Sequence, residues 1–159
     1  MKAYTIYKIY YGEELVYIGK TGMQLNQRLR THFFKTPMVR MIDITQVSKI
    51  EHASMSQADM IVMELYLINK CKPIMNAANK ARDELSFEIQ EPIFELYECE
   101  LMGKWANKIE DNDRHYAAEK VRKKEREKER LALRVKRREG EITEDEYWDQ
   151  YEELEQQED

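Results

Sequence analysis

The chain has 159 residues, of which 42% are hydrophobic and 36% charged, with a net charge of −5. This length allows one modest core with a small appendage and excludes a chain of several enzymes. No apolar run reaches about 18 residues and the first ten do not form a signal peptide, so we expect a soluble cytoplasmic protein without a membrane partner. Cys71, Cys99 and three scattered histidines match neither a disulfide framework nor a zinc finger.

The charge is distributed unevenly along the chain. Lys and Arg number 11 against 6 Asp and Glu in residues 1–80, 3 against 10 in 81–113, 12 against 5 in 114–140, and none against 10 in 141–159. A basic amino-terminal half is what binding to phosphates requires, and the acidic tail hides it in the total. The net charge therefore does not exclude a nucleic-acid partner.

Five elements are predicted in the amino-terminal half from β-branched and aromatic runs and from apolar periodicity. They are, in chain order, strands at 3–10 and 15–19, a helix at 23–35, a strand at 44–51 and a helix at 56–70. Thr21 with Gln24 is typical of a capping box before the first helix, and Ser54 or Ser56 caps the second. This order predicts an α/β layer fold, a small three-stranded antiparallel sheet flanked by helices.

The first two strands form a predicted hairpin around residues 11–14. If Ile6, Val16 and Ile18 face the core, period two puts Tyr7 and Tyr17 together on the other face. That arrangement requires paired residue numbers with an even sum, and hence a loop with an odd number of residues.

The carboxy-terminal half is predicted to be a charged helical extension. After the first domain at 1–80 we expect an acidic connecting extension at 81–112, with an edge strand or short extension within 86–98, and then a helical hairpin at 113–159. In the hairpin a polar helix at 113–138 ends at Gly140, and Thr143 with Glu146 forms a capping box for an acidic helix.

Two interpretations of the basic helix remain open. It could grip a nucleic-acid backbone, or it could pair with the acidic helix after Gly140. In either case the acidic tail could compete with nucleic acid and inhibit binding. The basic side chains concerned are Arg122, Lys123, Lys124, Arg126, Arg134, Lys136, Arg137 and Arg138.

Glu64 stands out as the only charge within residues 60–68, and it shares a helix face with Ile61 and Ile68. A carboxylate on an apolar stripe costs several kcal/mol unless it is paired or bound to a cation. It is therefore either half of a salt bridge or a ligand of Mg²⁺, which takes carboxylate oxygens and keeps several waters.

The ordered set of motifs over about residues 4–80 resembles the GIY-YIG endonucleases. It consists of Thr5-Ile6-Tyr7, with threonine in place of the family's usual glycine, then Tyr17-Ile18-Gly19-Lys20, Arg28, His32, Glu64 and Pro73-Ile74-Met75-Asn76. The resemblance implies a nuclease fold and a Mg²⁺- or Mn²⁺-dependent enzyme that hydrolyses DNA phosphodiester bonds to 5′-phosphate and 3′-hydroxyl ends.

The resemblance also implies roles for single residues. Tyr7 would be the general base, with its pKa depressed by Lys20 and the metal, and Tyr17 would position the water or phosphate. Arg28 would hold two phosphate oxygens with its planar fork. His32 would relay the proton or be merely packed, and Glu64 would bind the metal. Expected substrate-binding residues are Gly19, Lys20, Arg30 and Asn76, although Asn76 could instead tie the backbone near Glu64.

The chain contains no zinc finger or helix-turn-helix for reading a long site. A restriction-like, phage-encoded or mobile-element nuclease that acts as a homodimer, or on structured or single-stranded DNA, fits this length. The competing interpretation is a non-catalytic module that binds nucleic acid or protein on the same scaffold.

Overall fold

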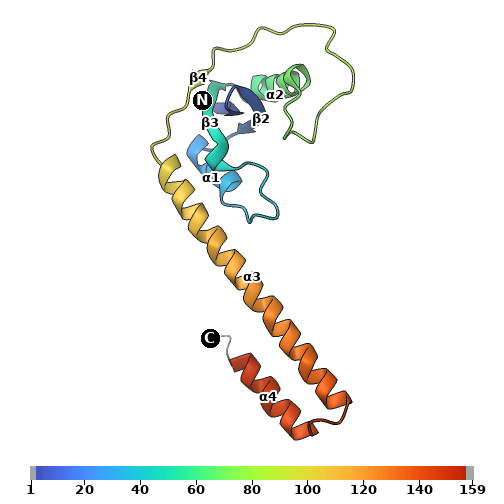
Figure 1. Ribbon diagram of the computed structural model, residues 1–159. Coiled ribbons are helices and arrows are strands. Elements are labelled where there is room, and N and C mark those ends of the chain that lie inside the picture. Colours follow the sequence, from blue (N-terminus) through green and yellow to red (C-terminus); the bar gives the residue numbers. More distant parts are fainter. Residues whose placement is uncertain (1–2, 157–159) are drawn as a thin grey trace. The chain divides into compact units, whose positions relative to one another are not determined.

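The structure is a computed structural model that describes residues 3–156 (Figure 1). Its elements are β1 (Tyr4–Tyr11), β2 (Glu14–Thr21), α1 (Leu25–Phe33), the 3-10 helix η1 (Ile44–Gln46), β3 (Val47–Met55), α2 (Gln57–Cys71), β4 (Glu95–Leu96), α3 (Met102–Arg138) and α4 (Glu144–Gln156). The chain divides into two compact units, Met1–Ile109 and Glu110–Asp159. Over the described residues, none of the helices combines the length and the apolar character needed to cross a membrane.

The first unit is built on an antiparallel sheet in the order β2-β1-β3-β4. The α/β class is as predicted, but the expected count of three strands is wrong. The fourth strand is the short edge strand expected within 86–98, where Glu95 pairs with His52 and Leu96 with Glu51. Its place is secured by the amide of Tyr97, which donates to the carbonyl of Ile50 at 2.7 Å.

A bulge sets the register of the first hairpin. Tyr7 lies opposite Gly19 and Ile9 opposite Tyr17, so the paired numbers have the predicted even sum. The turn nevertheless has two residues, and Gly12 supplies its positive φ of 56°. Between Ile9 and the turn the register shifts by one residue, which is a β-bulge. The bulge gives the even sum with a two-residue turn, so the predicted need for an odd loop was wrong.

The sheet has a buried cluster on each face. α2 covers one face, where it packs on Ile6, Ile18 and Ala53. The other face holds the tyrosines and is covered by α1 and the start of α3; its members include Tyr7, Ile9, Val16, Leu29, Phe33 and Trp105. Val16 was expected to share a face with Ile18, and the bulge moves it to the tyrosine side.

The helix caps differ from the predictions in one case. Thr21 is the last residue of β2, and its hydroxyl accepts from the amide of Met23 at 2.9 Å, so it does not cap α1. Gln24 holds the cap position without a side-chain hydrogen bond. Ser56 caps α2 as predicted, by accepting from the amide of Asp59 at 3.2 Å.

The third predicted strand is displaced along the chain. Instead of 44–51, the strand β3 runs from Val47 to Met55, and η1 precedes it. Asp43 causes this start, since its side chain accepts from the amide of Thr45 and caps η1.

The third helix begins well before the predicted residue 113. α3 starts at Met102, and Trp105 is buried at ring-centroid distances of 6.3 Å from both Phe33 and Phe34. Ile109 is buried in the same cluster. The segment expected to be an acidic connection therefore ends in a helical turn that completes the core of the first unit.

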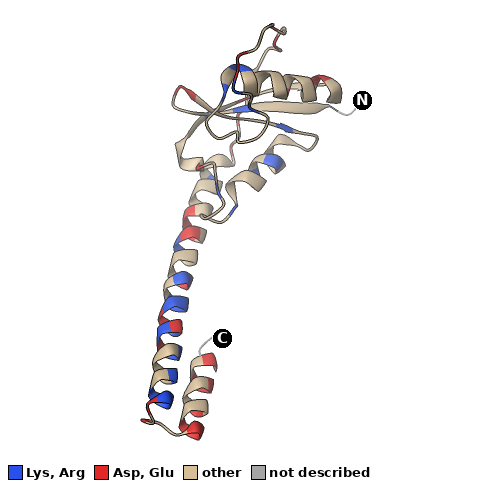
Figure 2. Ribbon diagram, turned by 90° about the vertical axis from the view of Figure 1, so that its right-hand side faces the viewer, with Lys and Arg blue, Asp and Glu red and all other residues tan. Residues whose placement is uncertain are grey.

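The second unit is the predicted helical hairpin. Gly140 has a φ of 72° and ends α3, and Thr143 and Glu146 form the predicted capping box, with the amide of Glu146 donating to the Thr143 hydroxyl at 3.2 Å. A guanidinium nitrogen of Arg137 lies 3.3 Å from Oε1 of Glu144, and Arg130 forms a salt bridge with Glu155. The acidic helix thus pairs with the carboxy-terminal part of α3 (Figure 2).

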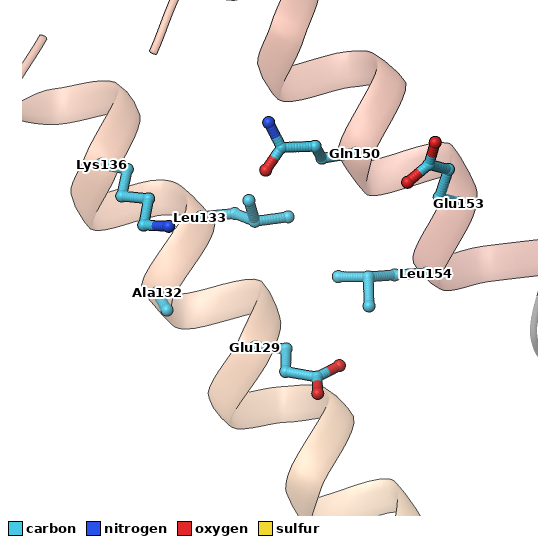
Figure 3. Close-up of a pocket in the computed structure, with 7 residues that line it drawn as sticks. All are labelled: Glu129, Ala132, Leu133, Lys136, Gln150, Glu153 and Leu154. Atoms are coloured by element: carbon cyan, nitrogen blue, oxygen red, sulfur yellow. The ribbon is translucent and has the colours of Figure 1, made fainter. Parts of the chain in front are cut away.

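A small pocket opens between the two helices of the hairpin (Figure 3). Leu133 from α3 and Leu154 from α4 point toward each other across it, and charged or amide groups surround them. The pocket marks where the narrow apolar seam of the hairpin is incompletely filled.

Candidate active site

Two tyrosines and a histidine form the centre of the site. The Tyr7 hydroxyl and Nε2 of His32 share a hydrogen bond of 2.7 Å. The rings of Tyr7 and Tyr17 lie 6.2 Å apart, and those of Tyr17 and His32 lie 5.2 Å apart. Three residues separated by up to 25 positions in sequence are thereby brought within contact of one another.

The fold positions these rings through the hairpin and α1. Tyr7 and Tyr17 project from neighbouring strands onto the same face, as the even-sum register requires. α1 lies on that face because Leu29 and Phe33 are fully buried in it. Arg28 and His32, four residues apart, then share one side of α1 and face the tyrosines.

Gly19 allows the close approach of the two tyrosine rings. A Cβ at this position would lie 2.4 Å from both Cζ and the hydroxyl oxygen of Tyr7, and 2.8 Å from Cε1 of Tyr17. Its φ is not positive. The tyrosine directly across the strand pair therefore requires a glycine here, and backbone strain does not account for it.

Arg28 lies beside both tyrosines. Its guanidinium interacts with the hydroxyls of Tyr7 and Tyr17 and lowers the pKa of each, against the larger effect of burial. Nε of Arg28 is buried and has no hydrogen-bond partner among the described residues. A buried, unpaired donor on a cation is costly, and a bound anion would satisfy it.

The electrostatics of the cluster oppose ionisation. Burial raises the pKa of Tyr7 well above its ordinary value of 10, and the adjacent Tyr17 raises it further. Burial, followed by the charges of Arg28 and Lys35, lowers the pKa of His32 to about 4, so the imidazole is neutral at pH 7. The expected depression of the Tyr7 pKa by Lys20 is absent, because that ammonium is engaged elsewhere and Arg28 is the cation next to the phenol.

Glu64 is a buried carboxylate with a cation at its side. It is 9% exposed, and its Oε2 lies 2.6 Å from Nζ of Lys20. The salt bridge, one of the two predicted alternatives, is therefore present. The charge of Glu64 also raises the pKa of Tyr17, which places the carboxylate close enough to the tyrosine cluster to act on it.

The donor set restricts which metals would fit. Within residues 3–156 no group of three His, Cys, Asp or Glu side chains could enclose an ion. Mg²⁺ needs no such cage, since it is commonly held by one or two carboxylates, waters and substrate phosphates. Glu64 suits Mg²⁺ or Mn²⁺ in this manner, and the residues present do not fit a closed structural zinc site.

Asn76 and Arg30 do not join the cluster. The side chain of Asn76 accepts from the amide of Ile18 and donates to its carbonyl, both at 2.8 Å. It thus pairs with the outer edge of β2 and ties the backbone there, which is one of the two roles predicted for it. Arg30 is exposed on α1, and its guanidinium lies 5.4 Å from the ring of Phe34.

Lys35 was absent from the predicted site, yet its charge acts on His32. It is exposed and stands three residues after the histidine, directly beyond the end of α1. The spacing of three residues from His32 could have indicated this in the sequence, since residues three apart lie close together at a helix end.

Comparisons of the chain with family models, with curated proteins and with solved structures found no match.

Proposed function

We propose that the chain is a metal-dependent endonuclease of the GIY-YIG type that hydrolyses DNA phosphodiester bonds. The observation that carries the proposal is the meeting of Tyr7, Tyr17, Arg28 and His32 around one buried hydrogen bond, with Arg28 holding an unpaired buried Nε. A set of ordinary strand aromatics would not need an arginine donor buried without an acceptor.

Arg28 is the phosphate-binding residue of the proposal. Its planar guanidinium can donate two parallel hydrogen bonds to phosphate oxygens and stabilise the charge that develops on them. Because Nε lacks a partner before substrate binds, the phosphate would satisfy a donor that is already desolvated.

The tyrosines and His32 move the proton of the attacking water. Tyr17 is only partly buried, whereas Tyr7 is fully buried, so Tyr17 is the hydroxyl that holds the water. Tyr7 acts as the general base through this contact and passes its proton to neutral His32, whose Nε2 already shares a hydrogen bond with it. The water oxygen bonds to phosphorus, the bond to the 3′ oxygen breaks, and that oxygen takes a proton from solvent water, leaving 5′-phosphate and 3′-hydroxyl ends. His32 then releases its proton to solvent and is neutral again.

Glu64 is the residue that would hold Mg²⁺ or Mn²⁺. When bound, the ion would polarise the phosphate and stabilise the leaving oxygen. Lys20 contacts Oε2 of the same carboxylate, so in the absence of an ion it compensates the buried charge.

The test is a cleavage assay on plasmid and single-stranded DNA with Mg²⁺. Wild type should nick or cut, and Arg28→Ala and Glu64→Ala should each lose about 10²-fold or more in rate, as removal of a transition-state donor does. Arg30→Ala is the matched control, since this arginine lies exposed on the same helix, and it should cleave within about threefold of wild type.

The competing function is a non-catalytic binding module, and the Lys20–Glu64 salt bridge at 2.6 Å is the observation that favours it. Under that function wild type, Arg28→Ala and Glu64→Ala would show equal background cleavage, and the enzyme proposal would be abandoned. A phosphate-binding module would still lose DNA affinity in Arg28→Ala.

A further inference from the structure

The loop that follows α1 and leads to η1 and β3 (Figure 1) carries large apolar side chains that are exposed. Met38 is 75% exposed, Val39 61% and Met41 51%. Single exposed apolar residues are ordinary, but three within four positions form a contiguous patch of the kind that marks a contact surface.

The loop is ordered by its own hydrogen bonds. The amides of Val39 and Arg40 both donate to the carbonyl of Thr36 at 3.0 Å. The guanidinium of Arg40 donates to the carbonyl of Lys35 at 3.1 Å from Nε and at 2.7 Å from its terminal nitrogen. These bonds hold the backbone of the loop, and the Met38 and Val39 side chains are largely exposed.

Both ends of the loop are anchored in the core. Phe33 is fully buried before it, and Ile42 is 1% exposed after it. An apolar tip on a closed, anchored loop loses little conformational entropy when it binds, which is the condition for an effective docking element.

The charges around the loop suit a nucleic acid. Lys35 and Arg40 lie within it, and Lys35 acts electrostatically on His32 of the candidate site. The loop also continues directly from α1, the helix that carries Arg28. Phe34 follows Arg28 by six positions, so the loop starts about 9 Å along the helix axis from the arginine proposed to bind phosphate.

We propose that Met38 and Val39 form an apolar wedge that inserts into a base step of duplex DNA near the phosphate held by Arg28. Proteins commonly kink a duplex by contacting the DNA backbone with basic residues and inserting an apolar side chain between two bases. Methionine is one of the side chains that serve this purpose. The inference rests on the proposed function for its substrate and adds to it how the strand is distorted for access.

The experiment measures base unstacking directly. Glu64→Ala protein, which should not cleave, is titrated into a series of duplexes that each carry 2-aminopurine at one successive position. We expect fluorescence to rise severalfold at one or two adjacent positions. Adding Met38→Ser with Val39→Ser should abolish that rise and weaken binding about tenfold or more.

The control replaces another exposed apolar pair with serine. Ile61 and Val62 are 41% and 52% exposed on α2, on the opposite face of the sheet. Ile61→Ser with Val62→Ser should leave the fluorescence rise and the affinity unchanged. Circular dichroism and thermal midpoints establish that all the variants are folded.

The outcomes separate the wedge from the nuclease. Binding with no fluorescence rise, or a loop variant equal to its parent, would overturn the wedge even if wild type cleaves DNA. A rise at defined positions without cleavage by wild type would keep the wedge and overturn the enzyme. Loss of self-association in the loop variant, with unchanged DNA binding, would assign the patch to a second copy of the chain. Absence of any DNA binding would remove both proposals.

Discussion

Gly19 is the residue on which the geometry of the tyrosine pair depends. The ring of Tyr7 lies over its Cα, and the space that a side chain would need is occupied by the phenol. The glycine in the Tyr17-Ile18-Gly19 motif is therefore explained by packing between strands. His32 is the other residue whose environment is unusual, because it is held neutral by burial and by two cations.

Gly19→Ala should destabilise the protein and disturb the site. The new Cβ would lie 2.4 Å from the Tyr7 ring, which must shift, and overpacking of this kind costs about 1–3 kcal/mol. Urea denaturation measures the change. Gly103→Ala on α3 is the control, since nothing lies within 4 Å of its added Cβ, and it should be neutral or stabilising by up to about 1 kcal/mol. Equal losses for both variants would contradict the packing explanation.

His32 should make stability depend on pH between about 6.5 and 4. Its pKa is lowered from 6.5 to about 4 on folding, so within this window the unfolded chain binds more protons. Stability is therefore full above pH 6.5 and falls as the pH drops toward 4. The shift corresponds to about 3 kcal/mol, and screening by solvent reduces it to about 1–2 kcal/mol.

The measurement is urea denaturation at pH 7 and pH 4 for wild type and His32→Gln. Glutamine can still accept the Tyr7 hydrogen bond but does not titrate, so the variant should lose less stability between the two pH values than wild type. An identical pH dependence in both proteins would show that His32 does not contribute.

Two segments that follow α2 in the chain complete the first unit: one closes the edge of β2 and the other covers the tyrosine face of the sheet. The edge of β2 is closed by the side chain of Asn76 and by the amide of Met75, which donates to the carbonyl of Val16 at 3.0 Å. The start of α3 closes the tyrosine face of the sheet through Trp105. Both segments lie after α2 in the chain, so the sheet is completed by residues outside the first five elements.

Trp105→Ala should destabilise the first unit strongly. The indole is 9% exposed and lies between Phe33 and Phe34, and truncating a buried tryptophan costs about 3–5 kcal/mol. Thermal or urea unfolding followed by circular dichroism measures the loss. Trp148→Ala on α4 is the control because this indole is 50% exposed, and it should cost less than about 1.5 kcal/mol. A small effect at Trp105 would mean that α3 does not belong to the core.

Most elements could be predicted from local sequence, and the errors have specific causes. Ser56, Gly140 and the Thr143–Glu146 capping box were found because caps and turns act within four residues. The bulge beside Val16 and the two-residue strand β4 were not predictable, since each is specified by hydrogen bonds to a distant partner. The early start of α3 was missed although the sequence carries a signal for it. Met102, Trp105, Ala106 and Ile109 recur at helical spacing, and all four pack in the core cluster of the first unit.

At the scale of the whole molecule, positive and negative side chains are concentrated in different segments. Within the second unit, the carboxy-terminal part of α3 is basic and α4 is acidic. The acidic helix α4 pairs with the carboxy-terminal part of the basic helix through Arg137–Glu144 and Arg130–Glu155. The ring of Tyr147 lies 4.3 Å from the guanidinium of Arg137 and is buried, so the pairing also has an apolar component. The acidic helix therefore neutralises part of the basic surface of α3.

Deleting residues 141–159 should tighten nucleic-acid binding severalfold at low salt, and the gain should shrink as salt screens the charges. Fluorescence anisotropy with a labelled duplex at two salt concentrations measures this. Glu144→Gln with Glu155→Gln removes two acidic partners while keeping Tyr147 in place, and it should produce a smaller gain in the same direction. Unchanged affinity in both proteins would refute inhibition by the tail.

The sequence by itself determined the local features: the caps, the glycine stop at Gly140, the order of the strands and helices, and the anomalous carboxylate at Glu64. These depend on neighbours within a few residues or on the composition of one helix face. The tertiary structure alone decided that Tyr7 and His32 share a hydrogen bond, that Gly19 makes room for a phenol, and that Lys20 pairs with Glu64. Such contacts join residues that are up to 44 positions apart, and their distances depend on a register that one bulged residue sets.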